Sequence, residues 1–295
     1  MAPDPFSFHS SLSFNWIFVM QSLNTGELQT GKRLVEDRFQ EIKMGNKIDF
    51  CHTYLELPDR GAFFSAVNNI ANMCKSGIKP ILHFDLHGLR NKSGIALLPS
   101  KESLSWQEFA SVCRTLNALC SNNLMIVMAS CYGLHAITEV SIKEISPYCY
   151  LIGSQEQVSA GAIDTGFKEF YSVLLKTCDV DSAMKTLDSR FRLYIAEKLF
   201  MVSFSSYLRE GCLGKGRRQR IERLLTEYVE LMKREGRSVR LKVARNSIKL
   251  NTKPNKEAFA RFANRFLMAD YPANSGRFNC VFEDAVYVAT NMKYQ

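Results

Sequence analysis

A histidine and a cysteine stand where two apolar runs of the sequence end. The run "KPILHFDLHG" closes on His87 and Gly88, and the run "LMIVMASCYG" leads into Cys131 just before a glycine. A thiol attacks as its thiolate, so a nucleophilic cysteine needs a nearby base or a lowered pKa. Histidine is the commonest such base. The two runs therefore predict a nucleophile, Cys131, and a general base, His87.

The segments around these residues alternate between strand and helix patterns. Strands are expected at residues 14–23, 48–57, 79–88, 94–99, 124–130 and 148–154. Helices are expected at residues 31–44, 61–77, 103–120 and 164–178. Ser105 and Glu108 form a candidate capping box for the third helix. Such alternation predicts an α/β fold, a mostly parallel sheet flanked by helices on both faces, which binds ligands at the carboxyl ends of its strands.

The spacing between the two candidate residues favours their meeting. Cys131 follows His87 by 44 residues, which hold a hairpin arm and one full helix. A right-handed crossover of that length sets the second long strand beside the first. Gly88 removes a side chain beside the histidine, so a substrate carbonyl could approach its backbone N–H. Together with the N–H of Cys131 this group would form an oxyanion hole.

Other residues compete for these roles. His83 lies four residues before His87, roughly 13 Å back along an extended strand, and is expected inside the sheet layer. His135 follows Cys131 closely, at a predicted helix start. Asp85 lies on the same strand face as His83 and His87. It is expected to orient a histidine, or to be a solvated or capping carboxylate. A lone histidine or cysteine at a strand end is more often structural, but the combination favours catalysis.

The two motifs, in this order, resemble the His-Gly and Cys motifs of the caspase-like cysteine peptidases, and most closely their CHAT and separase branch. In that branch a strand ending in His-Gly, a hairpin, a helix start similar to "LSWQEF" and a strand ending in Cys follow one another. The resemblance covers residues 12–190. One departure is that Gln155 and Glu156 stand where the family commonly has a tryptophan.

The resemblance implies a cysteine endopeptidase that cleaves through a thioester, with His87 as base, Cys131 as nucleophile and no metal or organic cofactor. It also implies an enzyme held inactive until a partner protein or ligand arrives, in bacterial stress or antiviral defence. The rival interpretation is an inactive pseudo-protease that serves as a scaffold binding nucleic acid or protein. The intact His-Cys pair argues against that rival.

The resemblance further implies an acidic residue that accepts a basic P1 side chain of the substrate. Matching "YLIGSQEQVSAGAIDTGF" by its strand and helix puts Asp164 at that place, with Glu156 as the second candidate. A partly buried carboxylate pairs well with Arg or Lys. Residues 150–167 contain these two acids and no Lys or Arg. The alternative for Asp164 is an N-cap of the following helix.

Composition narrows the remaining function classes. The nine cysteines include no CxxC pair, which argues against a disulfide framework or zinc site and for a reducing cytoplasm. No segment reaches the roughly 18 apolar residues that span a bilayer. The apolar stretch "FNWIFVM" is short and has no basic leader, so no secretory signal is expected. The sequence has no GxxxxGK[ST] or GxGxxG loop, which argues against a nucleotide-dependent enzyme.

The net charge of +9 is concentrated in the C-terminal third. Residues 209–265 carry 17 Lys and Arg against 6 Asp and Glu, whereas the rest of the chain carries 21 against 23. The sequence thus predicts a peptidase domain over residues 1–190 and a basic, largely helical extension over residues 191–295, packing on the core or on a partner. The basic side would bind nucleic acid or an acidic protein, or be a solvated face. Six apolar residues of the extension share one helix face that needs a cover: Ile221, Leu224, Leu225, Tyr228, Leu231 and Met232.

Overall fold

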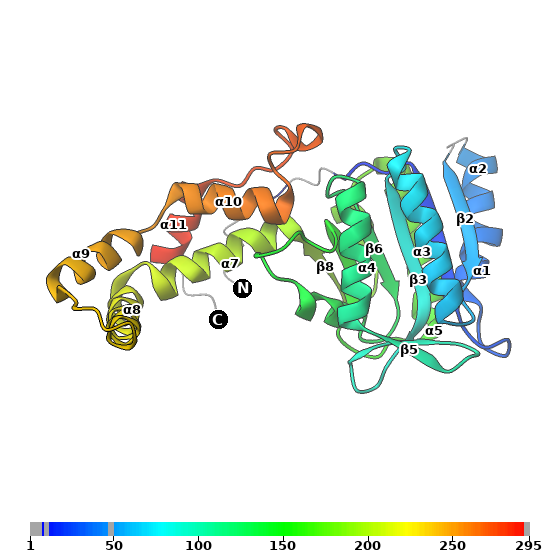
Figure 1. Ribbon diagram of the computed structural model, residues 1–295. Coiled ribbons are helices and arrows are strands. Elements are labelled where there is room, and N and C mark those ends of the chain that lie inside the picture. The colour runs from blue at the N-terminus through cyan, green and yellow to red at the C-terminus, as the bar shows by residue number, and fades with distance from the viewer. Residues whose placement is uncertain (1–7, 9–11, 47–49, 292–295) are drawn as a thin grey trace. The chain divides into compact units, whose positions relative to one another are not determined.

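The structure, a computed structural model, describes Phe8, residues 12–46 and residues 50–291 (Figure 1). Two compact units divide the chain. The sheet unit comprises Phe8–Ala196 together with Arg265–Phe278. The helical unit comprises Glu197–Asn264 and, among its described residues, 279–291.

The sheet unit is built on one sheet. Its strands are β1 (Trp16–Ser22), β2 (Cys51–Glu56), β3 (Pro80–Gly88), β4 (Gly94–Leu97), β5 (Glu102–Ser105), β6 (Met125–Ala129), β7 (Tyr150–Ser154) and β8 (Phe191–Ile195). The main order is β2-β1-β3-β6-β7-β8, parallel except that β8 runs antiparallel to β7. The hairpin β4–β5 pairs with the end of β3. The predicted α/β class and mostly parallel sheet are confirmed, while residues 48–49 of the expected second strand lie outside the described residues.

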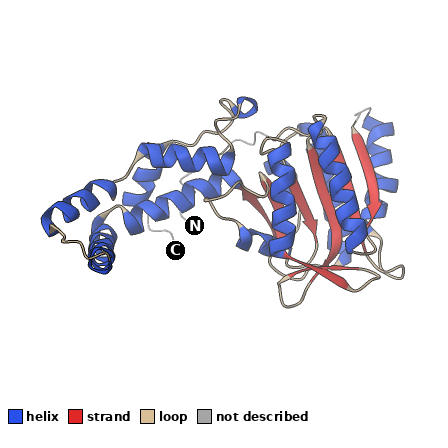
Figure 2. Cartoon of the chain, viewed as in Figure 1, coloured by secondary structure: helices blue, strands red, loops and turns tan. Residues whose placement is uncertain are grey.

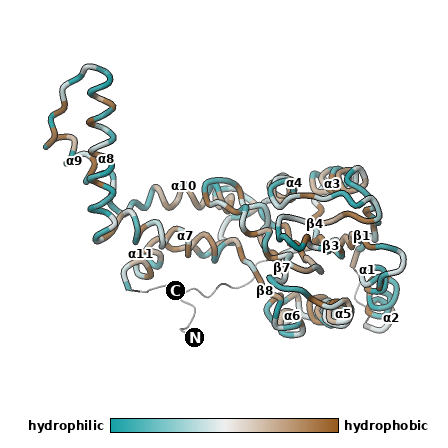
Figure 3. The backbone as a smooth tube through the Cα atoms, turned by 90° about the horizontal axis from the view of Figure 1, so that it is seen from below, coloured by the Kyte–Doolittle hydropathy of each residue, from teal (hydrophilic) through white to brown (hydrophobic). Residues whose placement is uncertain are grey.

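Helices cover both faces of this sheet. They are α1 (Thr30–Arg33), a π-helical segment (Leu34–Phe39), α2 (Gln40–Asn46), α3 (Arg60–Lys75), α4 (Trp106–Leu119), the 3₁₀ helix η2 (Gly133–Glu139), α5 (Ala160–Thr177), α6 (Val180–Met184) and the 3₁₀ helix η3 (Pro272–Asn274). Helices α3 and α4 lie on one face, and α5 and α6 lie on the other (Figures 1 and 3).

Local sequence signals explain where these elements begin and why the sheet is central. Ser105 and Glu108 form the predicted capping box, in which each side chain bonds the backbone N–H of the other, so α4 starts directly after β5. Every residue of β6 is buried and apolar, as expected for a central parallel strand covered on both faces. An aromatic and aliphatic core joins α5 to this sheet through Phe167, Phe170 and Tyr171.

The sheet unit extends beyond the boundary that the sequence predicted at residue 190. Residues 191–195 form β8, whose backbone hydrogen bonds to β7 make it part of the sheet. The segment Arg265–Phe278 also belongs to this unit, since Asn122 Nδ2 donates to the Leu267 carbonyl at 2.9 Å. The pairing of β8 with β7 therefore places the end of the sheet unit after residue 195 and not at residue 190.

The helical unit contains only helices and loops among its described residues (Figure 2). Its helices are α7 (Ala196–Gly211), α8 (Gly214–Arg234), α9 (Leu241–Asn251), α10 (Lys256–Leu267) and α11 (Phe282–Asn291). Phe259 is the centre of its core, with ring centroids 5.2 Å from Phe200, 5.0 Å from Phe204 and 5.7 Å from Phe282. Across the described ranges, no helix is long and apolar enough to cross a membrane.

Candidate active site

The sheet brings His87 and Cys131 to one edge. Strands β3 and β6 are parallel neighbours whose register pairs Asp85 with Ala129. His87 and Cys131 each come two residues further along, so they lie at the same end of adjacent strands. The crossover between them, which contains β4, β5 and α4, has the length that predicted this arrangement.

Both residues line one cavity of about 260 Å³, which we call the site cavity. It lies between the loop after β1, the ends of β3 and β6, and the start of α5. Its lining is Leu23, Glu27, Leu28, Thr30, Asp85, Leu86, His87, Ala129, Ser130, Cys131, Val158, Ala160 and Ile163. The described lining thus combines aliphatic walls with two carboxylates and includes no Lys or Arg.

The imidazole of His87 is held by a carboxylate that the sequence did not single out. Its Nε2 lies 2.8 Å from Oε1 of Glu27, and Glu27 also accepts the backbone N–H of Asn24 at 2.7 Å. Burial tends to raise the pKa of Glu27, but the hydrogen bonds from Asn24 and His87 outweigh it and lower this pKa. An ionised Glu27 fixes Nε2 as the donor, which leaves Nδ1 of His87 to accept a proton.

The thiol of Cys131 is half-buried and held by backbone groups. Its Sγ accepts the N–H of Val158 at 3.4 Å. The next residue, Tyr132, has a left-handed φ of 60° and donates its N–H to the Glu156 carbonyl at 3.2 Å. This turn ends the strand abruptly and leaves Cys131 at its tip.

Gly88 lies directly against the backbone of Cys131. A β-carbon at Gly88 would overlap the carbonyl oxygen of Cys131. Only glycine allows so close an approach of two backbones. The sequence predicted that the missing side chain of Gly88 leaves room for a substrate carbonyl, but in the structure the carbonyl oxygen of Cys131 occupies that place.

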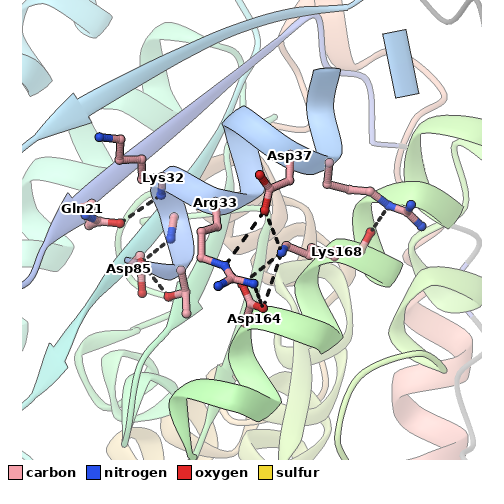
Figure 4. A network of polar contacts seen from close by, with 10 residues as sticks. Gln21, Lys32, Arg33, Asp37, Asp85, Asp164 and Lys168 are labelled. Atoms are coloured by element: carbon pink, nitrogen blue, oxygen red, sulfur yellow. Dashed lines mark hydrogen bonds and ion pairs between the residues drawn. The ribbon is translucent and has the colours of Figure 1, made fainter. Parts of the chain in front are cut away.

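Asp85 is the most deeply buried charged group of the site cavity. It is 2% exposed and accepts the hydroxyl of Thr30 at 2.7 Å and the N–H of Gly31 at 2.5 Å. Burial raises the pKa of Asp85 to about 6, against the opposing effect of these two hydrogen bonds. Of the roles weighed from the sequence, the capping role is observed, because Asp85 holds the first turn of α1 (Figure 4), while a solvated role is not.

Asp164 lies outside the lining of the site cavity. Its carboxylate is 3.1 Å from Nε of Arg33 and 3.2 Å from Nζ of Lys168, in the network of Figure 4. The alternative N-cap interpretation of Asp164 is wrong, because α5 begins at Ala160 and is capped by Ser159, which accepts the N–H of Ala162. The helix starts four residues earlier than its apolar pattern suggested.

Glu156, the second candidate for the P1 contact, is exposed and also absent from that lining. Its backbone has a structural role, since its carbonyl accepts from Tyr132 and its N–H donates to Ser154 Oγ at 3.0 Å. The structure thus brings His87, Gly88 and Cys131 to one place. It does not bring Asp164 or Glu156, the two predicted P1 residues, into the lining of the site cavity.

The rival histidines lie elsewhere. His83 is buried in the sheet layer, as expected, where its Nδ1 lies 3.2 Å from the Tyr171 hydroxyl and its ring packs on Phe167. Burial lowers the pKa of His83 to about 3, so this ring is neutral. His135 lies on η2, and neither histidine lines the site cavity.

Ser130 is a further polar group of the site cavity that sequence reasoning missed. Its side chain is buried, and its Oγ has no hydrogen-bond partner among the described residues. A buried hydroxyl without a partner is costly, which marks a place where a ligand could supply one. The described part of the chain contains no group of three or more His, Cys, Asp or Glu placed to hold a metal ion.

No protein-family model matches the chain, and no curated protein matches it. The chemistry of the site therefore has to be argued from its geometry and from the resemblance of its two motifs.

Proposed function

We propose that the protein is a cysteine endopeptidase in which Cys131 is the nucleophile and His87 the general base. The observation that carries the proposal is the shared cavity, in which a strand-tip thiol and a carboxylate-bound imidazole come from neighbouring strands. A nucleophile, a base in the same cavity and a group orienting that base are parts that covalent acyl transfer uses.

The reaction follows from these positions. Nδ1 of His87 takes the thiol proton as Sγ of Cys131 attacks the scissile carbonyl carbon. The backbone N–H groups of Gly88 and Cys131 stabilise the oxyanion. The imidazolium then protonates the leaving amine, and a thioester remains on Cys131. His87 next removes a proton from water, which attacks the thioester and releases the carboxylic acid and the free thiol.

Glu27 acts in this scheme through His87. Its carboxylate accepts the Nε2 hydrogen bond throughout and stabilises the imidazolium that forms after the thiol proton moves. A negative charge 2.8 Å from Nε2 also prevents the ring from flipping to present the wrong nitrogen. Glu27 is thus a positioning residue.

The order of elements supports the same proposal. A strand ending in His-Gly, a hairpin, a helix starting at "SWQEF" and a strand leading to Cys are here β3, β4–β5, α4 and β6. This is the order that the resemblance to CHAT and separase peptidases implies. The thiol of Cys131 is free of any disulfide, as a nucleophilic cysteine requires. The same resemblance implies that a partner protein activates the enzyme in stress or defence.

The site cavity favours a basic P1 side chain. Its aliphatic walls fit the methylene stem of Lys or Arg, and its two carboxylates have no cation among the described lining residues except His87. Asp164 is already paired with Arg33 and Lys168, so we assign the P1 contact to Asp85 instead. A bound cation would favour the ionised form of Asp85 and offset its burial.

The experiment is cleavage of fluorogenic peptides with Arg, Lys, Asp or Leu at P1 by the full chain and by Cys131→Ala. Loss of all cleavage in Cys131→Ala, with unchanged circular dichroism, supports the proposal. Cys178→Ala, which removes an exposed thiol outside the site cavity, is the matched control. Cleavage by Cys131→Ala at the wild-type rate would refute the assignment.

A further inference from the structure

The hairpin formed by α8 and α9 exposes many apolar side chains. Among the described residues, ten large hydrophobic side chains are exposed, and half of them lie in this one segment. They are Tyr228, Leu231, Leu241, Val243 and Leu250. Figure 3 shows α8 and α9 side by side, with hydrophobic and hydrophilic residues mixed along both. A cluster of this kind marks an interaction surface more often than scattered single residues do.

Helix α9 buries none of its 11 residues completely within the chain. A helix of that length is marginal in water unless a face of it packs against something. Val243 is 63% exposed and Leu250 is 65% exposed, one heptad apart on the same side of the helix. The predicted apolar face of α8 is only partly covered, since Ile221 and Leu225 are buried while Tyr228 and Leu231 are not.

A groove of about 390 Å³ runs between α8 and the start of α9. Its apolar walls come from both helices and the loop joining them. They include Tyr228, Val239, Val243, Ala244 and Ile248, and Arg240 is the one charged residue of the lining. The groove is thus shaped for an apolar anchor that has an acidic neighbour.

The α8–α9 hairpin as a whole is strongly basic. Residues 214–253 carry 13 Lys and Arg against 4 Asp and Glu. Three of those acids are already paired with arginines, as in the 2.7 Å contact between Arg245 and Glu222 that joins the two helices. Eight exposed cations of this segment have no ion pair among the described residues: Lys215, Arg218, Lys233, Arg234, Arg240, Lys242, Lys249 and Lys253.

We infer that the α8–α9 hairpin is the docking site of an acidic, amphipathic segment of a partner protein. Such a segment covers exposed apolar residues and brings acidic groups to the exposed cations of the hairpin. A nucleic acid would pair the cations but leave Leu231, Val243 and Leu250 in contact with water or phosphate. A second copy of the chain would bring the same positive surface against itself, which charge repulsion opposes.

The inference does not depend on peptidase activity, so its test is a binding measurement. Three fluorescent probes are titrated with the full chain by anisotropy. The first is an acidic helical peptide of about 16 residues with leucines at i, i+3, i+4 and i+7 spacing. The second has serines in place of those leucines, and the third is a single-stranded RNA of matched charge. The first probe is expected to bind at least about tenfold more tightly than the others.

Two double variants locate the binding. Val243→Ser with Leu250→Ser removes apolar contacts, and Lys242→Glu with Lys249→Glu reverses charge. All four residues are exposed, and circular dichroism checks that the helices persist. Each double variant is expected to weaken the first probe about tenfold or more.

Matched controls lie on other helices of the same unit. Tyr287→Ser on α11 and Arg261→Glu on α10 change exposed residues and are expected to leave binding unchanged. Tighter binding of the RNA, equal binding of the serine peptide, or unchanged binding by both double variants would overturn the inference. So would a wild-type dimer, seen by light scattering, that Val243→Ser with Leu250→Ser abolishes.

Discussion

Oε1 of Glu27 lies 2.8 Å from Nε2 of His87, although 60 residues separate the two in the chain. Glu27 comes from the loop after β1, and His87 from the end of β3, the strand beside it. Because Glu27 binds Nε2 of His87, only Nδ1 is left to accept a proton. The position of the loop after β1 therefore determines which nitrogen of His87 acts as the proposed base.

Replacing Glu27 by Gln should slow the reaction without weakening substrate binding. The amide oxygen of the glutamine could still accept a hydrogen bond from Nε2 of His87, but the neutral side chain would not stabilise the imidazolium. We expect kcat to fall by roughly 10²-fold with little change in KM, together with an altered pH profile of kcat. Glu36→Gln, at an exposed acid outside the site cavity, should behave as wild type. An effect of Glu27→Gln on KM alone would contradict the positioning role.

Asp85→Asn should remove the preference for a basic P1 residue. The buried carboxylate is the proposed partner of the substrate cation, so kcat/KM for Arg and Lys substrates should fall by roughly 10²-fold or more, the scale for unpairing a buried charge. A Leu substrate should be affected much less. Asp164→Asn is the comparison, and a larger loss there than at Asp85 would return the P1 contact to Asp164.

The same residue predicts a pH dependence of stability. Burial raises the folded-state pKa of Asp85 to about 6, above its ordinary value of 3.8, so the folded protein holds the proton more tightly than the unfolded chain. Asp85 therefore contributes more stability as pH falls from about 6 to 4, and this contribution is lost as pH rises through 6. Its size is on the order of 2–3 kcal/mol. Asp85→Asn should reduce the difference in the free energy of unfolding between pH 4.5 and pH 7, measured by urea unfolding.

Gly88→Ala should disturb both stability and activity. A β-carbon there would overlap the carbonyl oxygen of Cys131, so the ends of β3 and β6 must move apart. We expect a loss of about 1–3 kcal/mol in unfolding free energy and a large loss of kcat. Gly26→Ala is the control, since a β-carbon at Gly26 meets no atom within 4 Å. A fully active Gly88→Ala protein would show that the close approach is dispensable.

Local patterns determined most of the sheet unit. Apolar runs, helical periodicity and the capping box of Ser105 and Glu108 depend on neighbouring residues, so they can be read along the chain. The handedness and length rules for crossovers then place His87 and Cys131 on adjacent strands, as observed. The strand β8, which no expected element included, depends on antiparallel pairing with β7.

The sequence by itself therefore determined the class of fold and the placement of His87 and Cys131 at the same end of adjacent strands. Only the tertiary structure decided which acids surround them. Glu27 approaches His87 because the loop after β1 folds over the sheet edge, and Asp164 is kept away because Arg33, 131 residues distant, pairs with it. Strand order follows from short-range rules, whereas the partner of a charged side chain depends on distant residues that no local pattern relates.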